Sequence, residues 1–147
     1  MFAGCPYLSS ASVSNYISFA NVANAAGMFN YCYMANYNTI GSFTGSFSEN
    51  LSNATNMFYY CNALESMPLT YNQMKNIETG NYMFYQCVAM NGTFSNFNDT
   101  FTNLSNANSM FEGCGNVNGY WKSDLPVLNE ANRMFTYTGI ERFGDTD

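Results

Sequence analysis

The 147-residue chain contains no histidine, and this absence excludes several kinds of catalytic site. Without histidine, the Ser-His and Cys-His pairs that activate a nucleophile cannot form. The five cysteines include no C-x-x-C pair, which argues against a zinc site. The carboxylates of Glu65, Glu78 and Glu112 are far apart in the sequence, and nothing marks any two as an acid–base pair. We therefore expect no catalysis, no metal site and no cofactor.

Positive charge is also scarce. Four bases, Lys75, Lys122, Arg133 and Arg142, are scattered among ten acids, giving a net charge of −6. No basic stripe is available to neutralise phosphates, so nucleic acid and anionic membrane surfaces are disfavoured partners. No apolar run approaches the roughly 20 residues that cross a bilayer. No signal-peptide pattern opens the chain, and we expect neither nucleic-acid binding nor membrane insertion.

Apolar residues and asparagine are abundant. The chain is 47% hydrophobic and 18% aromatic, enough to fill the core of one ordinary domain. Its 23 asparagines suit turns and helix N-caps, because the short amide bonds to nearby backbone groups. This composition is typical of a chain with turns at regular intervals.

A Met-Phe-x-x-Cys frame repeats along the whole chain. It appears as "MFAGC", "MFNYC", "MFYYC", "MFYQC" and "MFEGC", and a sixth copy, "MFTYT", replaces Cys with Thr138. We expect one repeat domain covering residues 1–147 and belonging to a longer protein, because Met1 coincides with the repeated Met. Its units are 1–27, 28–56, 57–82, 83–109, 110–133 and a partial unit, 134–147.

The residues before each Met predict a helix. Leu51, Ala54, Phe58 and Cys61 lie at offsets of 0, 3, 7 and 10, which place them on one helical face. Asn50 precedes them as a helix N-cap. The other units repeat this spacing, so we expect about three turns of helix ending near each Cys.

The residues after the Cys predict a strand in some units. Leu64, Met67 and Leu69 fit the L-x-x-L-x-L strand signature of leucine-rich repeats, as do Leu8, Ala11 and Val13. The fits in the fourth unit (Met90 and Thr93) and the fifth (Val117 and Tyr120) are weaker. The expected fold is an α/β, right-handed leucine-rich-repeat solenoid with one short strand and one short helix per repeat of about 24–29 residues.

The recurring residues should then form internal ladders. We expect the cysteines to be buried free thiols, and Phe58→Ala to cost about 3–5 kcal/mol of unfolding free energy. The residues expected to be mostly buried are Met28, Phe29, Met57, Phe58, Cys61, Met83, Phe84 and Cys87.

The stretches "NLSNATNMFYYCNAL" and "NLSNANSMFEGCGNV" resemble the repeat of BspA-like leucine-rich-repeat surface proteins. The likeness covers nearly the whole chain. It implies an extracellular or cell-surface module that binds protein or glycan partners of a host or neighbouring cell, without catalysis. The strand segments are less regular than in that family, which has no universal ligand residues to carry over.

Phe94 and Trp121 form the candidate ligand site, together with Tyr120 and Lys122. Both aromatic residues follow their Met by 11 positions, which face outward on the concave sheet of a leucine-rich repeat. A strand shifted by one residue would instead turn both rings inward.

Two alternatives to adhesion stay open at this point. The chain could be a structural or receptor-binding segment of a phage virion or other large assembly, or a docking segment of a modular enzyme. The sequence leaves its oligomeric state open.

Overall fold

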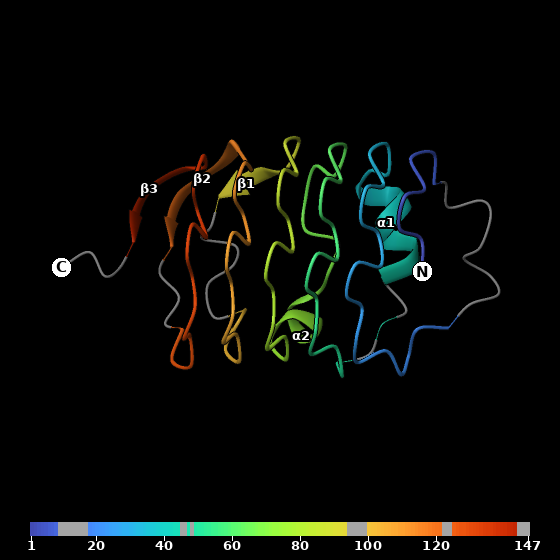
Figure 1. The fold of residues 1–147 in the computed structure, drawn as a ribbon, viewed down its shortest axis with the longest axis horizontal. Coiled ribbons are helices and arrows are strands. Elements are labelled where there is room, and N and C mark those ends of the chain that lie inside the picture. The colour runs from blue at the N-terminus through green and yellow to red at the C-terminus, as the bar shows by residue number, and fades with distance from the viewer. Residues whose placement is uncertain (9–17, 45–46, 48, 94–99, 122–124, 144–147) are drawn as a thin grey trace.

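The computed structural model describes the chain except for residues 9–17, 45–46, 48, 94–99, 122–124 and 144–147. Most of the described chain runs in turns, and successive repeat segments lie side by side along the long axis of the molecule (Figure 1). The regular elements in this part of the chain are α1 (Tyr37–Thr44), α2 (Tyr71–Met74), β1 (Asn91–Thr93), β2 (Asn116–Trp121) and β3 (Gly139–Phe143).

Each Met-Phe-x-x-Cys segment is a turn that bonds both to itself and to the next unit. Within one unit, the Cys61 N–H donates to the Phe58 carbonyl at 3.0 Å. Across units, the Phe58 N–H donates to the Met83 carbonyl at 2.9 Å. The same two bonds recur around Phe29 and Phe84. The backbone polar groups of these segments are thus shared between turn and neighbour, as burial requires.

The predicted helices before each Cys are wrong, because left-handed residues interrupt every segment. Tyr60, for example, has a φ of 58°, whereas every residue of an α-helix has negative φ. A series of turns separated by left-handed residues can bury apolar side chains at the same offsets, 0, 3, 7 and 10, as one face of a helix. The spacing alone therefore does not distinguish the two structures. The left-handed positions are Gly27, Asn56, Tyr82, Ser109 and Arg133 before each Met, and Gly4, Tyr31, Tyr60, Gln86 and Gly113 before each Cys.

The predicted right-handed leucine-rich-repeat solenoid, with one strand and one helix per repeat, is therefore wrong. The described residues hold two short helices and one three-stranded parallel sheet, ordered β1-β2-β3, which is neither closed nor curled. Gly92 of β1 pairs with Val117 of β2, and Asn118 of β2 pairs with Gly139 of β3. These strands lie in the last three units, whereas the better L-x-x-L-x-L match, residues 64–69, forms no strand.

The two helices fill positions that the repeat pattern did not predict. Asn36 caps α1, because its Oδ1 accepts a bond from the Thr39 N–H at 3.0 Å. Ile40 and Phe43, three residues apart, turn one face of α1 into the core. The buried Gln73 of α2 donates from Nε2 to the Phe47 carbonyl at 2.8 Å, which ties α2 to the segment after α1.

The core contains an inner phenylalanine row that crosses every unit. Adjacent rings of this row are stacked with centroids 5.2–5.8 Å apart. The eight Met, Phe and Cys side chains expected to be buried are all buried, which confirms the ladder prediction. The row consists of Phe2, Phe29, Phe58, Phe84, Phe111 and Phe135.

Buried thiols bridge successive units. Cys61 Sγ donates to the Phe29 carbonyl at 3.1 Å, and Cys87 Sγ donates to the Phe58 carbonyl at 3.1 Å. Each of these carbonyls also accepts the N–H of the Cys three residues later, so the thiol occupies its second acceptor site. A Cys at this position therefore supplies a small apolar side chain and a hydrogen-bond donor together.

All five cysteines are free, as expected, but Cys5 departs from the expected burial because it is exposed. Burial raises the pKa of the Cys32 thiol to about 11 and that of Cys114 to about 12. Thr138, which replaces Cys in the last copy, donates instead to the Phe135 carbonyl of its own unit at 2.7 Å. The hydrogen bonds from a thiol to the preceding unit therefore belong to the four inner copies of the motif.

Candidate functional site

The predicted concave site cannot be located in the structure. Phe94 and Lys122 lie outside the described residues. The backbone of Tyr120 and Trp121 belongs to β2, where it pairs with Arg142 and Phe143 of β3, but their side chains are also outside the described part. These four residues stay a sequence-based prediction.

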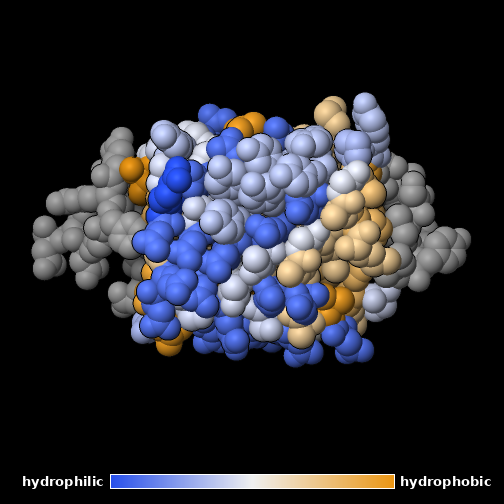
Figure 2. Space-filling model, viewed as in Figure 1, coloured by the Kyte–Doolittle hydropathy of each residue, from blue (hydrophilic) through white to orange (hydrophobic). Residues whose placement is uncertain are grey.

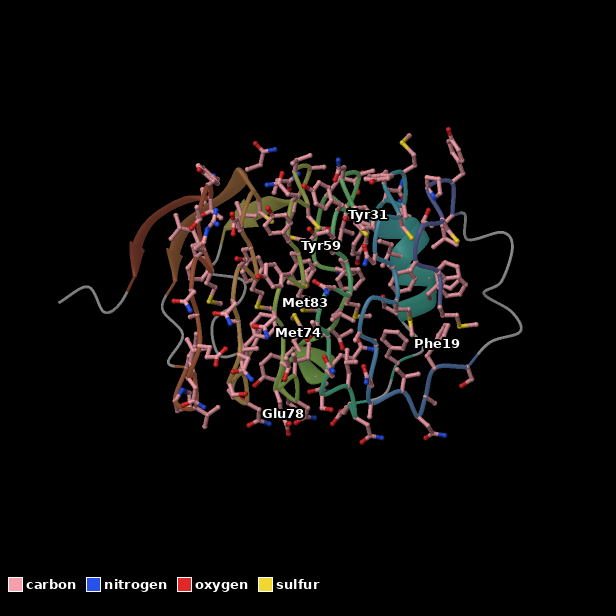
Figure 3. All side chains as sticks on the ribbon, in the orientation of Figure 1. Phe19, Tyr31, Tyr59, Met74, Glu78 and Met83 are labelled. Carbon is pink, nitrogen blue, oxygen red and sulfur yellow. The ribbon has the colours of Figure 1, made fainter. Side chains whose placement is uncertain are left out.

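A different aromatic surface stands out, and we call it the tyrosine patch. In Figure 3, Tyr31 and Tyr59 lie close to each other in the upper half of the view, in neighbouring segments. The patch is held together by ring contacts between successive units. Its members are Tyr31, Tyr33, Tyr59, Tyr60, Tyr82 and Tyr85.

The turn geometry explains why these tyrosines face outward. Phe58 and Cys61 point into the core, so the two residues between them, Tyr59 and Tyr60, occupy the outer side of the turn. Since every unit has the same turn, the outer positions of neighbouring units lie side by side. Tyrosine suits such a position, because its ring covers the apolar interior while its hydroxyl stays in contact with water.

The rings of the tyrosine patch contact each other in two ways. Tyr31 stacks on Tyr60 with centroids 5.4 Å apart, and Tyr59 stacks on Tyr85 at 5.0 Å. Other neighbours meet at steep angles: the planes of Tyr31 and Tyr59 differ by 76°. Both arrangements are favourable for aromatic pairs and limit the freedom of the side chains before any ligand binds.

A shallow groove of about 440 Å³ runs through the tyrosine patch. Its lining is Asn30, Tyr31, Asn56, Tyr59 and Tyr82, none of which carries a charge. Asn30 Oδ1 is shielded from solvent and accepts no hydrogen bond from the described residues. The groove therefore combines three aromatic rings with two side-chain amides.

Desolvation raises the pKa of two phenols of the patch, those of Tyr59 and Tyr85. Desolvation, reinforced by the neighbouring Tyr31, raises the pKa of Tyr59 to about 12. Desolvation, followed by the Glu112 carboxylate, raises the pKa of Tyr85. The hydroxyls of Tyr59 and Tyr85 therefore stay protonated and can donate hydrogen bonds to a ligand.

An ion pair borders the patch. Glu112 stands in its unit where Tyr85 stands in the preceding one, and its side chain is only 3% exposed. Arg133 Nη2 donates to Glu112 Oε1, so the buried carboxylate has a charged partner. The positive charge of Arg133 neutralises the negative charge of Glu112, so this end of the patch carries nearly no net charge.

Other kinds of site find little support in the structure. Among the described residues, no three His, Cys, Asp or Glu side chains are grouped as metal ligands. In the same part of the chain, no helix is long and apolar enough to cross a membrane. On the face drawn in Figure 2, strongly hydrophilic side chains cover much of the surface, and hydrophobic side chains gather toward the N-terminal end. The tyrosine patch is therefore the best candidate for a site.

Sequence reasoning missed the tyrosine patch, although its signal was present in the repeat. The two variable positions of Met-Phe-x-x-Cys read "NY", "YY" and "YQ" in three successive units. A helix would have spread these positions around its axis, whereas the shared turn brings them together on one surface.

Comparison with known proteins gives a family. The family model described as "Mycoplasma protein of unknown function, DUF285" matches residues 1–123. No curated protein and no solved structure matches the chain.

Proposed function

The chain belongs to the DUF285 family described for Mycoplasma. We propose that it is a non-catalytic binding module whose ligand surface is the tyrosine patch. The observation that carries the proposal is the groove lined by three tyrosines and two asparagines from adjacent units. Tyrosine offers a large and rather rigid contact area, and asparagine adds adaptable hydrogen bonds. Binding surfaces are enriched in tyrosine and commonly use asparagine for hydrogen bonds.

The setting of this module follows from the sequence resemblance. The BspA-like likeness of the Met-Phe-x-x-Cys repeat implies display outside the cell and adhesion to proteins or glycans of a host or neighbouring cell. We adopt that setting as part of the proposal. The exposed tyrosines at 39–41% relative accessibility, Tyr31, Tyr33 and Tyr82, are consistent with a surface open to a large partner.

The chain itself offers substitutions that test the patch without disturbing the turns. Asn30 occupies the position of Tyr59 one unit earlier, and Asn56 occupies that of Tyr82. Tyr59→Asn and Tyr82→Asn therefore place residues that this backbone already accepts. Asparagine also tolerates the left-handed φ of 55° at Tyr82.

The experiment compares three proteins on arrays of glycans and of host extracellular proteins: wild type, the patch variant Tyr59→Asn/Tyr82→Asn, and a control. The control variant, Tyr71→Asn/Tyr137→Asn, removes two exposed tyrosines that belong to none of the ring contacts of the patch. We expect ligands that wild type and control bind equally and that the patch variant binds at least tenfold more weakly, as hot-spot losses of about 2 kcal/mol imply.

Salt provides an independent check on the same ligands. The groove lining is uncharged, so raising the ionic strength should change the affinity little. If no ligand on the arrays loses affinity for the patch variant, the tyrosine patch is not the binding site. The same conclusion follows if moderate salt abolishes binding.

A further inference from the structure

We propose that the tyrosine patch is a site of oxidative cross-linking, at which dityrosine bonds form between stacked rings of successive units. One bond joins Tyr31 to Tyr60, and the other joins Tyr59 to Tyr85. The modification is independent of any ligand, because it needs only the contacts between the rings. Three observations carry it: the ring geometry, the exposure of the rings, and the burial of the sulfur side chains beside them.

Two ring pairs of the patch are aligned for coupling. Tyr59 lies on Tyr85 with centroids 5.0 Å apart and planes within 10° of parallel. Tyr31 lies on Tyr60 at 5.4 Å and 17°. Carbon atoms of the two rings face each other in such a stack, whereas a steep contact, such as Tyr31 with Tyr59 at 76°, directs the edge of one ring at the face of the other. Because dityrosine joins two ring carbons ortho to the hydroxyls, the stacked pairs are the ones prepared to react.

The paired rings are accessible as well as ordered. Tyr31 is exposed, and Tyr59, Tyr60 and Tyr85 are half-buried. An oxidant can therefore reach these phenols from the solvent. Since no ring of the two pairs is fully enclosed, the side chains also keep room to rotate and bring their ortho carbons together.

The sulfur side chains that adjoin these tyrosines in the sequence are shielded. Met57, Cys61, Met83 and Cys87 lie on the inner side of the same turns and are fully buried. Cysteine and methionine oxidise readily where they are exposed, and burial protects them. In these two turns, the tyrosines are therefore the oxidisable side chains that the solvent reaches.

The coupling is balanced with hydrogen peroxide as the oxidant and a haem peroxidase as the one-electron catalyst. Each of the two phenols gives up one electron and one proton and becomes a ring radical. The radicals join through a new bond between their ortho carbons, and the hydrogens of those carbons move to the two oxygens. The two tyrosines lose two hydrogen atoms in all, and one molecule of peroxide becomes two molecules of water.

The two bonds would tie three successive units together on the outer side of their turns. Tyr59 and Tyr60 belong to one unit, and their partners belong to the units after and before it. All five cysteines are free, so disulfides do not serve this purpose. A carbon–carbon bond also resists reductants, and a cross-link between distant residues restricts the unfolded chain. Cross-linked protein should therefore unfold at a higher urea concentration, with or without reductant.

The test treats dilute protein with a haem peroxidase and a limiting dose of hydrogen peroxide, and measures dityrosine fluorescence in the monomer fraction after size-exclusion chromatography. The patch variant, Tyr59→Phe/Tyr60→Phe, keeps both rings in their stacks but removes one phenol from each pair. The control variant, Tyr71→Phe/Tyr137→Phe, removes two exposed phenols that make no ring contact with the described residues. Exposed Met34 takes up oxidant equally in all three proteins, so the reading is dityrosine formed and not peroxide consumed.

We expect wild-type and control monomers to gain equal dityrosine fluorescence and to lose the mass of two hydrogen atoms for each bond. Peptide mapping by mass spectrometry should find Tyr31 joined to Tyr60, and Tyr59 joined to Tyr85. The patch variant should gain at least tenfold less fluorescence in its monomer fraction, while its circular dichroism spectrum stays that of the wild type.

Two results would overturn the inference. One is a wild-type monomer without dityrosine, all of the product lying in covalent dimers. The other is a patch variant whose monomer gains as much dityrosine as the wild type. A ligand on the arrays that depends on Tyr59 and Tyr82 would stand after either result, so the cross-link and the proposed function can fail separately.

Discussion

Phe58 and Tyr59 are adjacent in the sequence, yet they belong to two aromatic rows with opposite surroundings. Phe58 stacks between Phe29 and Phe84 in the inner phenylalanine row and is fully buried. Tyr59 stacks on Tyr85 in the tyrosine patch, at a similar spacing of 5.0 Å, but lies at the surface. The repeated turn thus stacks aromatic rings on its inner and its outer side. The inner stack lies in the core, and the outer stack lies at the surface.

The two rows also differ in regularity. The inner phenylalanine row runs unbroken through all six copies of the motif. The tyrosine patch is confined to the middle units, with Asn30 at one end and Glu112 at the other. A stabilising position has the same requirement in every unit, whereas a recognition surface needs its residues only where the ligand binds. This contrast suggests stability for the inner row and binding for the outer one.

Removing a ring from the middle of the inner row should give the largest effect. Phe84→Ala leaves a cavity between Phe58 and Phe111 and should lower the unfolding free energy by about 3–5 kcal/mol. Phe84→Leu keeps most of the buried volume and should cost clearly less. Urea denaturation followed by circular dichroism measures both, and equal costs for the two variants would contradict a packed ring stack.

The buried thiols should make the inner side sensitive to alkali. Burial raises the native pKa values of Cys32 and Cys114 to about 11 and about 12, from an ordinary value of 9.0. Above pH 9 the unfolded chain loses these protons while the native protein keeps them. The unfolding free energy should therefore be at its full value below pH 9. It should then fall by up to about 1.4 kcal/mol per thiol for each further pH unit.

Denaturation between pH 8 and pH 10 tests this dependence, in a range below the raised pKa of Tyr59. Cys114→Ala removes one of the thiols and should make the decline shallower. A stability that stays level across this range would show that the thiols are not held in a dry interior.

Two glycine substitutions should have smaller effects of opposite sign. Gly27 has a φ of 63° at the left-handed position where Asn56 and Tyr82 stand in later units. Gly27→Ala should cost about 1–2 kcal/mol, because a Cβ disfavours this conformation. Gly41→Ala in α1 should stabilise by roughly 1 kcal/mol, since alanine is the better helix former.

An added Cβ meets no atom within 4 Å at either glycine, so sterics do not confuse the comparison. Thermal unfolding of the two variants gives the signs directly. The same sign for both would argue against the left-handed backbone at residue 27.

Part of this architecture can be predicted from the sequence. The recurrence of Phe58, Cys61 and their equivalents predicts burial correctly, because an apolar residue that returns in every unit must face a common interior. The helices before each Cys were predicted wrongly. Turns with a left-handed residue, such as Tyr60 at a φ of 58°, repeat with nearly the spacing of a helix, and tyrosine gives no sign of this conformation.

The tyrosine patch could not be predicted once a helix had been assumed. Tyr31 and Tyr60 come together only because their turns stack in register, which depends on bonds between units such as Tyr31 N–H to the Tyr59 carbonyl at 2.8 Å. The tyrosines recur at fixed positions of the repeat, but only the stacking of the turns shows that these positions share one surface. The structure alone brings Asn30 and Asn56 into the same groove.

The division between the two rows is tested most directly by the unfolding free energies of Phe58→Ala and Tyr59→Ala, measured side by side by urea denaturation. Phe58→Ala should lose about 3–5 kcal/mol, because it empties a fully buried site. Tyr59→Ala should lose clearly less, about 1–2 kcal/mol, because its ring is only half-buried and its contacts with other tyrosines lie at the surface. A loss for Tyr59→Ala as large as that for Phe58→Ala would show that the outer row, too, exists to hold the fold together.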